Sequence, residues 1–160
     1  MKIESDVVRK ALEFATKAHK GQVRKNTSEP YINHPIAVAE IVSSVTNNQD
    51  IVAAALLHDT VEDTDVTIED IEENFNFCIK SWVESLTDVS KPEDGNRKIR
   101  KDIDLKHTDM ALPPAKTIKL ADLIDNTETI TEYDEGFAKI YMAEKRKLLE
   151  VLKQGNKILY

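Results

Sequence analysis

A chain of 160 residues with 41% hydrophobic and 32% charged residues can bury the core of one globular domain. Its 4 Gly and 5 Pro are too few for many short strands joined by tight turns, so we expect a single all-α domain over residues 1–160. The formal net charge of -7 argues against a nucleic-acid polymer as partner, because its phosphates would be repelled. A small phosphorylated ligand remains compatible with this charge, provided that cations gather locally.

Hydrophobic residues at helical spacing predict a bundle of seven or eight helices. The predicted helices cover residues 5–20, 34–45, 50–63, 67–75, 79–86, 97–106, 113–130 and 138–153. Asp50 is expected to cap the third helix, and Thr67 with Asp70 forms a near capping box on the fourth. The third helix is apolar on nearly all sides before His58, which indicates that it is buried. A turn over 134–137 is expected before the last helix.

The remaining general features indicate a cytoplasmic protein. No apolar run reaches the ~20 residues that a membrane span needs, and the N-terminal MKIESDVVRK lacks the apolar stretch of a signal peptide. The single cysteine, Cys78, excludes an internal disulfide and is expected to be a buried apolar residue. The sequence leaves the oligomeric state open, a homo-oligomer included.

Four side chains from three segments can bind one divalent metal ion: His34, His58, Asp59 and Asp122. Each also has a structural interpretation, such as a helix cap for His34 or a salt bridge from Lys119 to Asp122. However, His58, Asp59 and Asp122 adjoin apolar runs, where an unpaired charge costs about several kcal/mol to bury. A cation such as Mn, Fe, Zn or Mg would offset that cost, and imidazole and carboxylate ligands suit such an ion.

Two further carboxylates, Glu62 and Asp63, follow His58 and Asp59 in the segment HDTVED. If the helix continues through this segment, Glu62 shares a face with His58, which lies four residues earlier. Negative charge at a helix C-terminus opposes the helix dipole and calls for compensation. Beside a metal-bound water, such a pair can orient the water and take its proton, so we predict that Glu62 and Asp63 are catalytic.

Positive charge gathers at Lys17, Lys20, Arg24 and Lys25 although the chain is acidic. These residues either form a solvated face and loop or clamp the phosphates and base of a nucleotide, and charge alone does not separate the two. A second basic cluster covers residues 97–101, where a solvated helix surface is an equal alternative.

The segments AHKGQVRK, EPYINHPIAVA, AALLHDTVEDT and IKLADLIDN resemble the hydrolase domain of the RelA/SpoT family, which belongs to the HD superfamily. The resemblance implies an HD-type helical bundle that removes the 3′-pyrophosphate of guanosine tetra- and pentaphosphate with manganese. It implies that His34, His58, Asp59 and Asp122 are the metal ligands. It also implies that Glu62 and Asp63 activate the water, and that the nucleotide contacts are Arg24, Lys25, Lys119, Asn126 and Thr129. For Lys119, a solvent-facing charge is an equal alternative.

Several positions depart from the family pattern. The RKNTSEPY loop is one residue longer, and Leu123, Asp125 and Glu128 stand where the family typically has Arg, His and Arg. These changes remove positive charge near the expected pocket and leave the metal ligands intact. A different nucleotide, such as a 3′-phosphorylated cofactor or a deoxynucleotide, therefore remains an alternative substrate. A non-catalytic nucleotide sensor is a second alternative.

Overall fold

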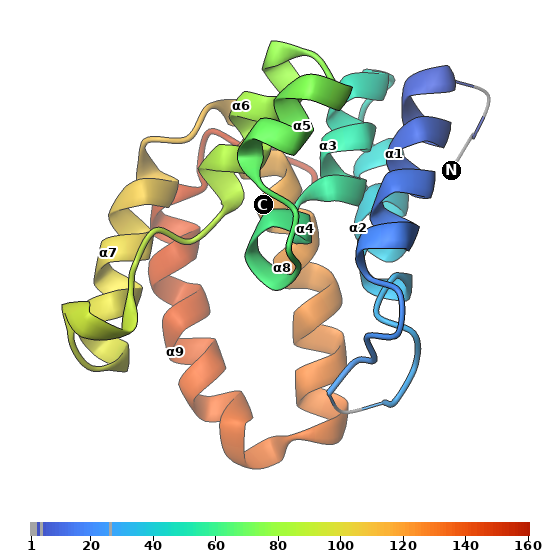
Figure 1. Ribbon diagram of the computed structural model, residues 1–160. Coiled ribbons are helices and arrows are strands. Elements are labelled where there is room, and N and C mark those ends of the chain that lie inside the picture. Colours follow the sequence, from blue (N-terminus) through green and yellow to red (C-terminus); the bar gives the residue numbers. More distant parts are fainter. Residues whose placement is uncertain (1–2, 4, 26) are drawn as a thin grey trace.

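The computed structural model describes residues 3, 5–25 and 27–160, which fold into α-helices with one 3-10 helix (Figure 1). These elements are α1 (Asp6–Ala18), α2 (Asn33–Ser43), α3 (Gln49–Leu57), α4 (Thr60–Asp63), α5 (Ile68–Asn74), α6 (Phe77–Leu86), η1 (Pro92–Asp94), α7 (Arg97–Asp109), α8 (Pro113–Tyr133) and α9 (Glu135–Val151). The described residues contain an isolated bridge between Val23 and Pro30 but no strand, so the predicted all-α class is confirmed. Asn26 of the predicted loop lies outside the described residues. Within the described part, none of the helices combines the length and apolar character needed to cross a membrane.

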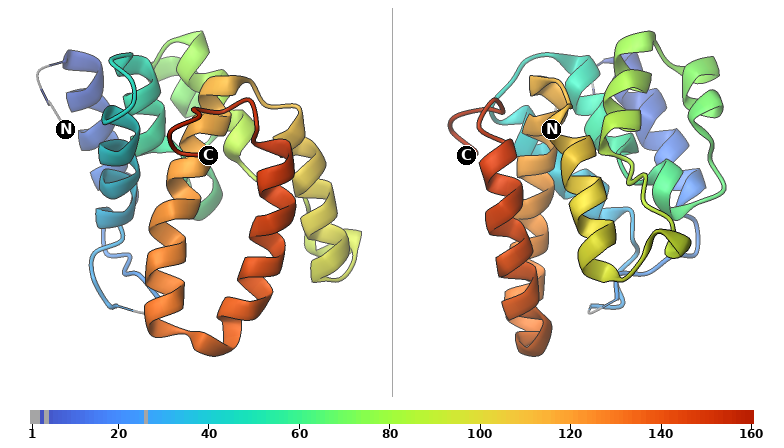
Figure 2. Two further views of the ribbon diagram at one scale, coloured as in Figure 1. Left: turned by 180° about the vertical axis from the view of Figure 1, so that it is seen from behind. Right: turned by 90° about the vertical axis from the view of Figure 1, so that its left-hand side faces the viewer.

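Helix α3 forms the centre of the core. It packs against α1, α2, α6 and α8, and Figures 1 and 2 show α1, α2 and α3 side by side. Every residue from 52 to 57 is buried, as predicted, and the alanines among them let neighbouring helices approach closely. The polar residues that follow Leu57 are thereby held against the core.

Side-chain caps set the start of several helices. Asn48, rather than the expected Asp50, caps α3, because the Asn48 side chain accepts the backbone N–H of Asp50 at 3.0 Å. Thr67 and Asp70 form the complete capping box of α5, in agreement with the prediction. Local polar residues thus set where α3 and α5 begin.

Helices α8 and α9 form a hairpin that extends beyond the remaining helices (Figures 1 and 2). Asp134 alone separates them, and its side chain accepts the N–H of Phe137 at 3.0 Å. The expected turn over 134–137 is therefore wrong, because this cap lets α9 begin at Glu135. The α8–α9 pair has its own small apolar cluster, built on Leu120, Leu123 and Leu152.

Cys78 is exposed, so the expectation that it is a buried apolar residue is wrong. It is the second residue of α6, whose buried face consists of Ile79, Trp82, Val83 and Leu86. Cys78 lies outside that face, in the first turn of the helix.

Candidate metal centre and nucleotide cavity

Three contacting elements bring His34, His58, Asp59 and Asp122 together. His34 is the second residue of α2, His58 and Asp59 lie between α3 and α4, and Asp122 lies in the middle of α8. Each pair among α2, α3 and α8 is in contact. The two histidines and Asp122 are buried, with relative exposures of 2%, 3% and 5%.

The four side chains direct one atom each toward a common point. His34 Nε2 lies 3.5 Å from Asp59 Oδ2 and 3.1 Å from Asp122 Oδ1. His58 Nε2 lies 3.0 Å and 3.7 Å from the same two oxygens. Ligand atoms of His34, His58 and Asp59 all lie within 4.8 Å of one another. Asp122 is not part of this group of three, although its Oδ1 lies near both imidazole nitrogens.

The chemistry of this donor set fits a divalent cation. His58 Nε2 is buried and lies 3.0 Å from Asp59 Oδ2, but among the described residues it makes no hydrogen bond of acceptable geometry, which leaves this polar atom suited to a bound cation. Two imidazole nitrogens and two carboxylate oxygens are ligands that transition metals such as manganese, iron and zinc accept.

The pKa values in the metal-free protein follow from this crowding. Burial alone lowers the pKa of His34, but hydrogen bonds to Asp122, Asp125 and Asp59 raise it to about 11. Burial likewise opposes the charge on His58, yet the Asp59 carboxylate raises its pKa to about 10. Burial would raise the pKa of Asp59, but the charge of His58 holds it well below its usual range. A metal that binds here must therefore displace protons from the imidazoles.

The chain breaks between α3 and α4, so the predicted continuous helix over 50–63 is wrong. α3 ends at Leu57, and Asp59 has φ -100° and ψ -3°. The break is stabilised by the Thr60 hydroxyl, which donates to the Leu57 carbonyl at 2.8 Å. Glu62 consequently does not share a helical face with His58, but α4 places Glu62 and Asp63 on the wall of a cavity.

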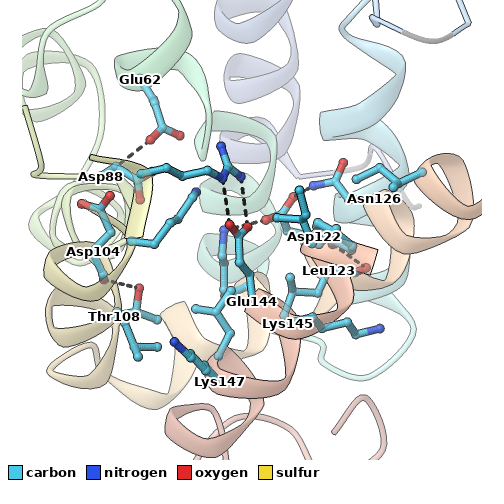
Figure 3. A pocket seen from close by; sticks show the side chains of 18 of the residues that line it. Glu62, Asp88, Asp104, Thr108, Asp122, Leu123, Asn126, Glu144, Lys145 and Lys147 are labelled. Carbon is cyan, nitrogen blue, oxygen red and sulfur yellow. Dashed lines mark hydrogen bonds and ion pairs between the residues drawn. The ribbon is translucent and has the colours of Figure 1, made fainter. Parts of the chain in front are cut away.

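That cavity has a volume of about 640 Å³ and is bounded by residues of α4, α7, α8 and α9 (Figure 3). Asp59 and Asp122 lie on its wall, so the candidate metal centre opens into it. Figure 3 shows Glu62 beside Asp88, whose backbone N–H donates to Glu62 Oε1 at 3.2 Å. Although the Glu62 side chain reaches solvent, partial burial of its carboxyl and the charge of Asp88 raise its pKa to about 8.

Lys119 also lies on the wall of the larger cavity. Its Nζ donates to Asp122 Oδ2 at 2.8 Å, and 26% of its side chain is exposed. The alternative in which Lys119 is a solvent-facing charge is therefore wrong. The salt bridge that was the structural alternative for Asp122 is present and uses Oδ2, while Oδ1 faces the imidazoles and also accepts a hydrogen bond from Asn126 Nδ2 at 2.7 Å.

A smaller cavity of about 210 Å³ brings together the other four predicted nucleotide contacts. They are Arg24, Lys25, Asn126 and Thr129. Both cavities have Tyr31, Asn126, Ile130 and Phe137 on their walls, so the two are adjacent. An elongated ligand could therefore occupy both and reach the metal centre.

Of the remaining basic residues, some line a cavity and others form a solvated surface. Arg97, Lys98 and Lys101 of α7 line the larger cavity, and Arg97 pairs with Glu144 of α9 at 2.8 Å. Lys17 and Lys20, by contrast, are exposed and are not among the residues of either cavity wall.

The sequence interpretation missed Tyr31. Its hydroxyl donates to Asp59 Oδ2 at 2.6 Å and lies 3.2 Å from Asp63 Oδ2. Burial, followed by the charge of Asp59, raises the pKa of Tyr31 well above its usual range, so the phenol remains a donor. The ring of His19 packs against that of Tyr31 at a tilt of 42°, with ring centroids 4.8 Å apart. The position of Tyr31 inside EPYINHP was the available signal, but no spacing rule assigns it a role.

Replacing Tyr31 with Phe is expected to weaken metal binding or slow turnover by about tenfold to a hundredfold, because the hydroxyl orients the Asp59 carboxylate. Calorimetric titration with Mn²⁺ measures the first effect and steady-state kinetics the second. Tyr160→Phe is the matched control, since Tyr160 is exposed at the end of the chain. Wild-type values for both quantities in Tyr31→Phe would contradict the role of the hydroxyl.

Comparison with known proteins agrees with this geometry. The HD domain family matches residues 11–148. The guanosine-3′,5′-bis(diphosphate) 3′-pyrophosphohydrolase MESH1 of Xenopus tropicalis is 34% identical, over 99% of this chain and 92% of its own. The guanosine-3′,5′-bis(diphosphate) 3′-pyrophosphohydrolase of Aquifex aeolicus is 34% identical over 89% of this chain, which spans 19% of that longer protein.

Among solved structures, one described as a metazoan ortholog of SpoT that hydrolyzes ppGpp superposes with a TM-score of 0.88 and 29% identity. The superposition covers 99% of this chain and 92% of the other. The helical architecture, the clustered His and Asp side chains and these relatives agree with one another: the chain belongs to the HD domain family, in the group of the MESH1 and SpoT-type proteins.

Proposed function

We propose that this protein hydrolyses guanosine 3′,5′-bis(diphosphate) to GDP and pyrophosphate, and the pentaphosphate to GTP and pyrophosphate. The observation that supports this most directly is the convergence of His34, His58, Asp59 and Asp122 at a cavity lined by Glu62 and Asp63. The names of the relatives point to the same substrate. A small nucleotide is thus the proposed ligand, and the acidic chain disfavours a polymer.

The proposed cofactor is one divalent metal, Mn²⁺, held by His34, His58, Asp59 and Asp122. Mixed nitrogen and oxygen ligands suit manganese, and a thiolate is absent from the described cluster. When bound, such a metal supplies a Lewis acid for a phosphoryl oxygen and acidifies water to give a nucleophile near neutral pH. A cytoplasmic location stays a prediction of the sequence.

The remaining roles fall to side chains on the two cavity walls. Glu62, with its raised pKa, accepts the proton of the attacking water, and Asp63 orients that water. Lys119 places positive charge beside the reacting phosphoryl group. Arg24 and Lys25 hold the nucleoside in the smaller cavity. Asn126 and Thr129 of α8 contact it from the helix that lines the same cavity.

The test is to incubate the purified protein with Mn²⁺ and the alarmone and to separate the products. Stoichiometric GDP and pyrophosphate are expected. Metal-loaded protein that releases no pyrophosphate would reject the substrate. A panel of 3′-phosphorylated cofactors and deoxynucleotides, followed by phosphate and pyrophosphate detection, then separates another substrate from a non-catalytic sensor. The substitutions that remove positive charge, at Leu123, Asp125 and Glu128, are the reason to run this panel.

Replacing Asp88 with Asn is expected to move the acid limb of the kcat/KM profile to lower pH. After burial, the Asp88 charge is the main cause of the raised pKa of Glu62, so removing it lowers that pKa. Glu62 is then deprotonated, and able to accept a proton, at lower pH. The backbone N–H of Asp88 that donates to Glu62 is retained. The exposed Asp65→Asn variant is the control, and an unshifted limb in Asp88→Asn would contradict the role of Glu62 as base.

A further inference from the structure

The two ring nitrogens of His34 face different partners. Nε2 points toward Asp59 and Asp122, where the metal is proposed to bind. Nδ1 lies 2.6 Å from Asp125 Oδ2. A carboxylate accepts, so Nδ1 keeps its hydrogen, and once the Nε2 proton is displaced the lone pair of Nε2 faces the metal centre. Because His34 is 2% exposed, water cannot readily replace this acceptor.

The same carboxylate oxygen has a second partner. Arg24 Nη2 donates to Asp125 Oδ2 at 3.0 Å, and both side chains are largely buried, with 13% and 15% exposed. Arg24 also lines the smaller cavity. Asp125 Oδ2 on α8 therefore contacts both His34, the proposed metal ligand on α2, and Arg24, in the loop before α2.

His58 is oriented in a different way. Its Nδ1 donates to the backbone carbonyl of Ala55 at 2.7 Å, three residues away. The Nδ1 atom of His58 is therefore held by the local backbone, whereas Nδ1 of His34 depends on a side chain 91 residues distant in sequence. A histidine at position 125, as the family resemblance would suggest, could not provide a negative charge to both Arg24 and His34.

From these contacts we infer that Asp125 is a positioning residue. Its carboxylate fixes the ring of His34 for metal binding and holds Arg24 in the wall of the smaller cavity. The departure from the family pattern at this position is thus more than a loss of positive charge, because it supplies the acceptor for one metal ligand. The part that concerns Arg24 rests on the proposed function, and the part that concerns metal binding does not.

Two substitutions separate these contributions. Asp125→Ala removes the acceptor, so Mn²⁺ affinity of the purified full chain is expected to fall about tenfold to a hundredfold. Asp125→Asn keeps a carbonyl oxygen for His34 but loses the charge that pairs with Arg24. We expect it to retain most of the metal affinity and to raise KM for the alarmone more than it lowers kcat. Glu132→Ala, an exposed position on the same helix, is the matched control.

Calorimetric titration with Mn²⁺ measures affinity without reference to any substrate. Wild-type affinity in Asp125→Ala, or equal losses in the Ala and Asn variants, would overturn the positioning role. If Asp125→Ala does not fold, Asp125→Ser takes its place, since serine is too short to reach the ring, and the same criteria apply. If the wild type cleaves no alarmone but the affinities follow the expected order, the proposed substrate fails and the role of Asp125 in metal binding stands.

Discussion

Replacing Glu62 with Gln is expected to slow alarmone turnover by about a hundredfold or more while leaving Mn²⁺ affinity nearly unchanged. Glu62 lines the cavity but is not one of the proposed metal ligands. Glutamine keeps the size of the side chain and an oxygen for the backbone N–H of Asp88. It cannot accept a proton from water, whereas the raised pKa of Glu62 makes its carboxylate a stronger base.

Single-turnover kinetics with metal-loaded protein measures the effect of Glu62→Gln on the chemical step, and calorimetry measures metal affinity. Glu13→Gln makes the same chemical change on the exposed face of α1 and should behave as the wild type. Turnover within a few-fold of the wild type would assign proton transfer to another group, with Asp63 the next candidate. A parallel loss of metal would instead show that Glu62 takes part in binding.

Replacing Asp59 with Ala is expected to abolish stable Mn²⁺ binding and, with it, hydrolysis. Asp59 Oδ2 lies within 3.5 Å of both imidazole nitrogens, so alanine removes an oxygen ligand from the centre of the donor set. The loss of Mn²⁺ affinity should exceed about tenfold to a hundredfold, which is the cost typical of residues that only orient ligands. Tyr31→Phe is expected to fall within that smaller range. Asp65→Ala, on the exposed segment after α4, is the control.

Metal content after dialysis and thermal unfolding with and without Mn²⁺ test this second prediction. A ligand at about a hundred times its Kd stabilises the folded state by about 2.7 kcal/mol, so the wild type should unfold at a higher temperature when Mn²⁺ is added. Asp59→Ala should show no such increase. A retained increase, together with bound metal, would remove Asp59 from the ligand set.

The candidate metal ligands could be predicted from the sequence because their environment is unusual at the local level. His58 and Asp59 follow a run of buried residues, and Asp122 lies within an apolar segment. Ionisable groups in such places need compensation, and the resemblance to a known family supplied the rest. The helix break between α3 and α4 could not be predicted, because HDTVED has no Gly or Pro and the stabilising bond comes from the hydroxyl of Thr60, a residue type that also occurs inside helices.

Tyr31 and Asp125 were not predicted, because their contacts are long-range in sequence. Asp125 contacts His34 across 91 residues, and Tyr31 contacts Asp59 across 28. A tyrosine in a loop and an aspartate on a helix carry no local mark of such a role. From the sequence, Asp125 was interpreted only as the loss of a positive charge. In the structure its carboxylate contacts both Arg24 and His34.

The position of α9 bears on how the protein could change its substrate. This helix packs mainly against α7 and α8, and within the described residues the proposed ligands all come from earlier elements. Its side chains Ile140, Tyr141 and Glu144 nevertheless form part of the larger cavity wall. Substitutions along this one helix could therefore reshape the space for a nucleoside during evolution while the hydrolytic machinery is inherited intact.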